Sequence, residues 1–280
     1  MTLGHPATAH EEHVDGYGGL RIFLRSWRPA AARGVVVIVH GFNSHGGYYG
    51  WTADRLVESG LAVYALDLRG RGKSDGERYY VQDAAEYLND VARVVTLAKS
   101  REPGLPVFVL GHSAGGVVSC LYTLDHPAEV DGLICESFAH ELPAPDLAIA
   151  VLKGLSHVAP HAHILRLKID DFSRDPAVIA AMKADPFVAD EVQPTHTIAE
   201  MVRVNDRLGR DFDQITLPVL ILHGTADKVT LAGGSQKFYD HAGSKDKTLK
   251  LYEGHAHDLL NDFGKEQVMD DITQWITARL

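Results

Sequence analysis

Cysteine is scarce in this sequence, which contains only Cys120 and Cys135 among its 280 residues. Both lie in apolar segments, and no Cys-x-x-Cys spacing typical of a zinc or redox site occurs. Thiols in such surroundings are more often buried and reduced than joined in a disulfide. The sequence therefore predicts neither a disulfide-rich scaffold nor a cysteine-ligated metal.

Positive charge and long apolar runs are lacking as well. The chain has 27 basic and 37 acidic residues, a net charge of -10, whereas nucleic acids and anionic membranes bind basic surfaces. Residues 1–19 are polar, and no apolar segment approaches the length of a membrane-spanning helix. We therefore expect a cytoplasmic protein that neither binds nucleic acid nor inserts stably into a membrane.

Short apolar runs rich in β-branched residues alternate with longer helix-like stretches. Most of these runs are continuous, which is typical of parallel strands covered on both faces. Residues 81–101 and 264–280 carry one apolar stripe each and predict covering helices. The pattern predicts an α/β fold with a doubly wound, mostly parallel sheet. The predicted strands span residues 20–27, 34–39, 61–66, 107–110, 132–135, 219–222 and 248–252.

The alternation is interrupted at residues 138–213, where no clear strand is apparent. Prolines there separate helix-like pieces at 146–158, 175–183 and 197–208. Because structureless loops of that length are uncommon in compact domains, we expect a helical cap insertion. The core domain is then formed by residues 1–137 and 214–280.

Gly111-His112-Ser113-Ala114-Gly115 follows a predicted strand and begins a helix-like run. This is the Gly-x-Ser-x-Gly elbow in the strand-to-helix context that the motif requires. The glycines allow the neighbouring backbone to approach a sharp turn that presents the serine. Ser113 is therefore the predicted nucleophile.

A serine nucleophile needs a histidine base and an orienting carboxylate, which this fold supplies in the order Ser, Asp, His. Asp227 follows the predicted strand 219–222 and is the predicted acid. His255 and His257 both lie between the last strand and the last helix, and their spacing leaves open which one is the base. His-x-His could also suggest zinc, but a zinc site needs further convergent ligands. We expect no metal and no cofactor.

The oxyanion of the tetrahedral intermediate needs two backbone N–H donors. One is expected from Ala114, directly after the nucleophile, and the other from the loop after an early strand. That loop is Gly-rich and begins His40-Gly41-Phe42, which makes the Phe42 N–H the second predicted donor.

Together these features resemble the monoacylglycerol lipase and lysophospholipase branch of the α/β-hydrolases over nearly the whole chain. The resemblance implies the α/β-hydrolase fold and a triad of Ser113, Asp227 and His257, since the family's histidine stands three residues after a glycine. Two positions depart from the better-known lipases, because Ala114 replaces Met and Arg71 stands where many have His. The motifs that carry the resemblance are His40-Gly-x-x-x-His45, Asp67-Leu-Arg-Gly-Arg-Gly-Lys-Ser74, Gly111-His-Ser-Ala-Gly-Gly116, Phe172-Ser-Arg-Asp175 and His257-Asp-Leu-Leu-Asn261.

The favoured function is hydrolysis of small-molecule or lipid-like carboxylic esters through an acyl-enzyme. An aminopeptidase or other amide hydrolase of the same superfamily would instead want a carboxylate in the cap to hold an amino terminus. The sequence offers four for that role: Glu141, Asp146, Asp170 and Asp171. A non-catalytic binding module on this fold is the third interpretation, although such proteins lack part of the triad.

The predicted cap helix 146–158 is apolar on almost all sides. Leu152 and Leu155 are therefore expected either to line an acyl pocket or to pack the cap on the core, and transient contact with a lipid surface stays open. Acyl-chain length, leaving group and oligomeric state do not follow from the sequence.

Overall fold

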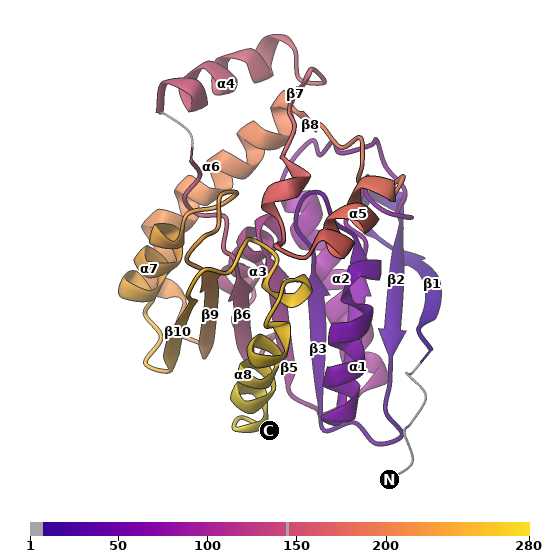
Figure 1. The fold of residues 1–280 in the computed structure, drawn as a ribbon. Coiled ribbons are helices and arrows are strands. Elements are labelled where there is room, and N and C mark those ends of the chain that lie inside the picture. The colour runs from indigo at the N-terminus through magenta and orange to yellow at the C-terminus, as the bar shows by residue number, and fades with distance from the viewer. Residues whose placement is uncertain (1–7, 144–145) are drawn as a thin grey trace.

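A computed structural model describes residues 8–143 and 146–280 and places a mostly parallel, eight-stranded sheet at the centre of the chain (Figure 1). The strand order is β1-β2-β4-β3-β5-β6-β9-β10, in which β1–β2 and β2–β4 pair antiparallel and the other neighbours parallel. This confirms the predicted doubly wound α/β sheet. The strands are β1 (His10–Asp15), β2 (Arg21–Trp27), β3 (Gly34–Val39), β4 (Leu61–Leu66), β5 (Val107–His112), β6 (Gly132–Glu136), β9 (Val219–Gly224) and β10 (Lys247–Tyr252).

Helices cover both faces of the sheet. Helices α2 (Ala85–Arg101), α3 (Ala114–Asp125) and α7 (Ala232–His241) pack into one apolar layer, and α1 (Gly50–Glu58) and α8 (Lys265–Thr277) pack into the other. The stripes predicted for α2 and α8 are buried, as Val91 and Val94 on α2 and Ile272 on α8 show. Strands β3, β4 and β5 are buried along their whole length, because each contributes side chains to both layers.

The insertion stands beyond one end of the sheet in Figure 1. It contains α4 (Asp146–Val158), α5 (Pro176–Ala184) and α6 (Thr195–Asp211), which confirms the three predicted helices with small shifts of their ends. It also contains a pair of short antiparallel strands, β7 (His163–Leu165) and β8 (Gln193–Pro194), so the expectation of a segment without strands was wrong. These strands are too short to produce a periodic pattern in the sequence. Division into a core of residues 1–137 and 214–280 and a cap of 138–213 stays a prediction.

Strand β1 was also not predicted. Its sequence, His10 to Asp15, is polar, and its side chains are exposed or only half-buried because it lies at the edge of the sheet. The sheet is therefore mixed at this edge. None of the helices within the described residues has the length and apolar character needed to cross a bilayer.

Candidate active site

Ser113 lies at the turn between β5 and α3, in a backbone conformation that few residues other than glycine adopt (φ 55°, ψ -120°). The turn is closely packed, because a Cβ atom added at Gly115 would lie 2.1 Å from the carbonyl oxygen of Val39. A Cβ added at Gly111 would lie 2.5 Å from the carbonyl oxygen of Gly115. This geometry explains the two glycines of the motif and is that of a strained nucleophile elbow.

The loop after β3 packs directly against this turn. A Cβ atom added at Gly41 would lie 2.8 Å from the Cβ of Ser113 and 3.4 Å from the amide nitrogen of Ala114. Within the described part of the chain, neither the Phe42 nor the Ala114 N–H donates to a protein acceptor. Two unengaged donors beside Ser113 are the arrangement that an oxyanion hole needs, and their catalytic role stays a prediction.

Asp227 and His257 are in direct contact. The Nδ1 atom of His257 lies 2.7 Å from Oδ2 of Asp227, and neither side chain is exposed. Burial alone would raise the pKa of Asp227, but the charge of His257 and hydrogen bonds from His223, His257 and Thr230 lower it below the usual range. Asp227 is thus ionised and holds Nδ1–H, which leaves Nε2 of His257 unprotonated when the imidazole is neutral.

His223 and Thr230 complete the support of Asp227. The Oδ2 atom of Asp227 lies 3.1 Å from Nε2 of His223 and accepts a hydrogen bond from Oγ1 of Thr230 at 2.9 Å. The Val229 and Thr230 N–H groups donate to Oδ1 at 2.8 and 3.0 Å. Sequence reasoning missed both side chains. The only sequence signal for the contact of His223 with Asp227 was their separation of four residues.

The Nε2 atom of His257 is buried and has no hydrogen-bond partner among the described residues. The ring is held between His112, at 4.8 Å between ring centroids, and Phe172 of the insertion, edge-to-face at 5.1 Å. Ser137 donates through Oγ to the carbonyl oxygen of His257 at 2.5 Å and fixes its backbone. Nε2 therefore makes no hydrogen bond with Ser113 Oγ or with any competing group of the described residues, and its role as the base for Ser113 stays a prediction.

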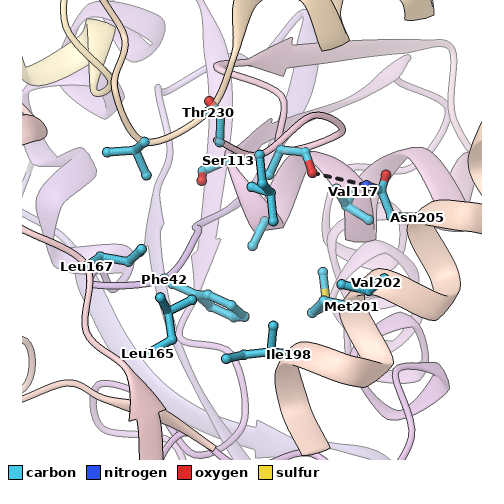
Figure 2. A pocket seen from close by; sticks show the side chains of 14 residues that line it. Phe42, Ser113, Val117, Leu165, Leu167, Ile198, Met201, Val202, Asn205 and Thr230 are labelled. Atoms are coloured by element: carbon cyan, nitrogen blue, oxygen red, sulfur yellow. Dashed lines mark hydrogen bonds between the residues drawn. The ribbon is translucent and has the colours of Figure 1, made fainter. Parts of the chain in front are cut away.

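A cavity opens onto Ser113 (Figure 2). Its walls come from core residues such as Phe42 and Val117 and from three parts of the insertion, the first of which contributes Ala139 and Leu142. Helix α6 contributes Ile198, Met201, Val202 and Asn205, and Leu165 and Leu167 lie at and after β7. None of the described residues that line this cavity is Asp, Glu, Lys or Arg. The site therefore matches an apolar substrate better than a charged one.

Leu152 and Leu155 do not line this cavity. They lie on α4, which packs against α6, and Leu155 is 38% exposed. Ile198 and Met201 form the wall instead, and their spacing of three residues on a predicted helix was the signal that sequence reasoning left unused. Contact of Leu152 and Leu155 with substrate stays a prediction.

One group of buried side chains within the described residues could in principle hold a metal ion. The ligand atoms of His112, Glu136 and Asp258 lie within 4.8 Å of one another. However, the Leu259 N–H already donates to Glu136, and Nδ2 of Asn261 donates to both carboxylate oxygens of Asp258. Neither His255 nor His257 belongs to this group, and no other such group occurs among the described residues. Absence of a metal from the reaction stays a prediction.

A strained serine elbow, a buried Asp–His pair and two free amide donors at the carboxyl ends of parallel strands define a hydrolase of the serine type on an α/β scaffold. Comparison with known proteins agrees with this class. Residues 30–263 match the family described as serine aminopeptidase S33, and the chain belongs to this α/β-hydrolase family.

Relatives extend over the whole chain. A monoacylglycerol lipase from Mycolicibacterium smegmatis is 36% identical and covers 98% of this chain and 99% of its own length. The monoglyceride lipase of Rattus norvegicus is 29% identical over 96% of this chain and 90% of its own. The crystal structure of a Paleococcus ferrophilus monoacylglycerol lipase superposes with a TM-score of 0.84 at 28% identity, covering 92% of this chain and 99% of that one. The chain is thus a lipase- or esterase-like ester hydrolase, which confirms the predicted family and enzyme class.

Proposed function

We propose that this chain hydrolyses esters of one fatty acyl chain with a small alcohol, such as monoacylglycerols, through an acyl-enzyme on Ser113. The observation that carries the proposal is the cavity on Ser113, whose described lining residues are mostly apolar and include no charged side chain. An acyl chain would occupy this cavity, because burial of each methylene group contributes about 0.8 kcal/mol. The monoacylglycerol lipases among the relatives support the same substrate class.

The chemistry follows from the site. His257 Nε2 takes the proton of Ser113 Oγ as the oxygen attacks the ester carbonyl, and the Phe42 and Ala114 N–H groups stabilise the resulting oxyanion. The intermediate collapses, the alcohol leaves with the proton from His257, and the acyl group stays on Ser113. Water, deprotonated by His257, then attacks the acyl-enzyme, and His257 returns the proton to Ser113 Oγ as the fatty acid leaves. Asp227 stays ionised throughout and orients the imidazole.

An aminopeptidase activity is less well supported, although the family description carries that word. Such an enzyme needs a carboxylate at the site to bind the substrate's amino terminus. Glu141, Asp170 and Asp171 do not line the cavity, and the side chain of Asp146 lies outside the described residues. A binding module without activity is disfavoured, since all three triad residues are present.

A lipid surface is the proposed source of the substrate. On α4, Val151 is 62% exposed and Val158 is 84% exposed, which gives an apolar surface to the helix that packs against α6. Transient contact of α4 with a lipid aggregate and a cytoplasmic location remain proposals.

A fluorophosphonate probe and a substrate panel test the function together. We expect one covalent adduct, mapped to Ser113 by mass spectrometry, and hydrolysis of a monoacylglycerol. Ser113→Ala should lose both, with kcat lower by on the order of 10⁶-fold, because members of a triad act as one unit. An adduct on another serine, or turnover of an aminoacyl anilide but of no ester, would refute the proposal.

A further inference from the structure

The loop that carries Phe42 is held from outside by the insertion. We define the oxyanion loop as residues 41–48 and the cap clasp as residues 185–193. The Asn43 N–H donates to Oε1 of Glu191 at 2.9 Å, and Nδ2 of Asn43 donates to the carbonyl oxygen of Val188 at 3.4 Å. At the other end of the loop, His45 Nε2 and Tyr48 Oη lie 2.9 and 3.0 Å from Oδ2 of Asp185. The cap clasp therefore contacts the oxyanion loop at both ends.

A buried ion pair lies at the centre of this contact. Arg71 donates through Nη1 to Oε1 of Glu191, and both side chains are only 1% exposed. Nη2 of Arg71 donates to Oε1 of Gln193 at 2.7 Å, and the guanidinium carbon lies 4.2 Å from the ring centroid of Phe42. Arg71 thus contacts Phe42, whose N–H is the proposed oxyanion donor. Glu191 accepts a hydrogen bond from the N–H of Asn43, the next residue.

The oxyanion loop needs such an external anchor. The Phe42 N–H must stay without a protein partner if it is to donate to the oxyanion, so it cannot fix the loop itself. Asn43 has a positive φ of 50°, a conformation that a residue with a side chain adopts at a cost. Loss of Glu191 would leave the Asn43 N–H without its acceptor, which would allow the loop to shift the Phe42 N–H away from the oxyanion position.

We propose that Arg71 and Glu191 are positioning residues that couple docking of the cap to formation of the oxyanion hole. The inference rests on the proposed function, because it assigns the Phe42 N–H a role in catalysis. A buried ion pair is in general weak evidence for stability, and its better-attested use is to specify one conformation. Here the specified conformation is that of the oxyanion loop.

The test compares Glu191→Gln with the double variant Arg71→Met/Glu191→Gln. Glutamine keeps an acceptor for the Asn43 N–H but removes the charge that holds Arg71. We expect kcat for p-nitrophenyl octanoate to fall about 10- to 100-fold with KM within about twofold, since small misplacements of a catalytic donor have effects of this size. The double variant should be no worse than the single, because the pair acts as one unit.

Two inhibitors separate positioning from loss of the fold. An alkyl trifluoromethyl ketone adds to Ser113 and places an oxyanion in the hole, whereas an alkanol of the same chain length only fills the cavity. Glu191→Gln should weaken the ketone in proportion to kcat and leave the alkanol unchanged. If Glu191→Gln does not fold, Arg71→Lys, which keeps the charge but loses the second donor to Gln193, is measured in the same way.

Arg207→Met is the matched control. Arg207 on α6 pairs with Asp125 on α3, an ion pair between insertion and core that does not touch the oxyanion loop. Its kcat and ketone affinity should equal those of the wild type. Equal loss of ketone and alkanol affinity in Glu191→Gln, or wild-type kcat in that variant, would overturn the inference. Failure of the proposed function looks different, since the wild-type chain would then neither hydrolyse esters nor react at Ser113.

Discussion

At the scale of single residues, burial restricts which hydrogen bonds the side chains of the site can form. Asp227 and His257 are both inaccessible, so the carboxylate can act only on Nδ1 of the imidazole and on the donors around it. His255, two residues earlier, instead packs against the Tyr252 ring at 5.5 Å between centroids. The two histidines that the local pattern did not separate therefore have different surroundings.

The two histidines should respond differently to substitution. His257→Ala should lower kcat by on the order of 10⁶-fold, as loss of a triad base does, because nothing else removes the Ser113 proton. His255→Ala should stay within about tenfold of the wild type, since it loses contacts with Tyr252 but no reacting group. Steady-state kinetics with a p-nitrophenyl ester measures both. The reverse ranking would reassign the base.

His40 should make stability depend on pH. It is completely buried, with Nδ1 bonded to the Gly41 carbonyl and Nε2 accepting the Leu68 N–H. Burial lowers the pKa of His40 to about 3, so the unfolded chain binds a proton at a higher pH than the folded one. The free energy of unfolding is therefore unaffected by protonation of His40 above about pH 6.5 and decreases as the pH falls from there toward 3. The decrease amounts to about 1.4 kcal/mol for each unit by which the two pKa values differ.

The variant His40→Gln isolates this contribution. Glutamine can still accept from the Leu68 N–H but does not titrate, so Tm should fall at pH 7 and then decline less steeply than in the wild type between pH 6.5 and 4. Other groups, such as Glu136, whose buried carboxyl has a raised pKa, act in both proteins and cancel in the difference. Parallel Tm-against-pH curves would show that His40 does not contribute.

At the scale of elements, the two helices α6 and α4 of the insertion differ in what their apolar side chains contact. Helix α6 presents Ile198, Met201 and Val202 to the cavity, and α4 lies against α6 and exposes apolar side chains such as Val158 (Figures 1 and 2). Under the proposed function, α6 would bind the acyl chain and α4 would contact the aggregate that supplies it.

Chain-length preference should therefore follow α6. In the wild type, kcat/KM for soluble esters should rise up to about fourfold per methylene until the cavity is full, from about 0.8 kcal/mol for each one buried. Met201→Asn should flatten that dependence and spare acetate, whereas Leu155→Asn should leave it unchanged. A p-nitrophenyl ester series from acetate to palmitate measures both slopes. Flattening by Leu155→Asn instead would support the hypothesis that α4 contacts the acyl chain.

At the scale of the whole molecule, charge and apolar surface act in opposite directions on a lipid aggregate. The net charge is -10, which disfavours approach to an anionic surface, while the exposed side chains of α4 favour contact with any apolar one. The surface charge of the aggregate should therefore determine how readily the enzyme reaches its substrate.

The dependence of the apparent KM on salt concentration should distinguish charge repulsion from apolar attraction. With monoacylglycerol in anionic mixed micelles, the apparent KM should be higher than in neutral micelles at low ionic strength and should fall as salt screens the repulsion. In neutral micelles salt should have little effect, which provides the control. A lower KM on anionic micelles at low salt would mean that local basic side chains on the insertion outweigh the net charge.

The sequence alone determined the scaffold and predicted the candidate catalytic residues. Continuous apolar runs gave most of the strands, and the elbow around Ser113 and the turn at Asp227 followed from local backbone requirements that a motif records. The polar strand β1 and the short strands β7 and β8 were not predicted, because their sequences carry no periodic apolar pattern. The local pattern did not separate His257 from His255, although the family resemblance did. Only the tertiary structure placed Ile198 and Met201 at the cavity and brought Glu191 to Arg71. These relations join residues that are distant along the chain, and packing, not local pattern, decides which of them meet.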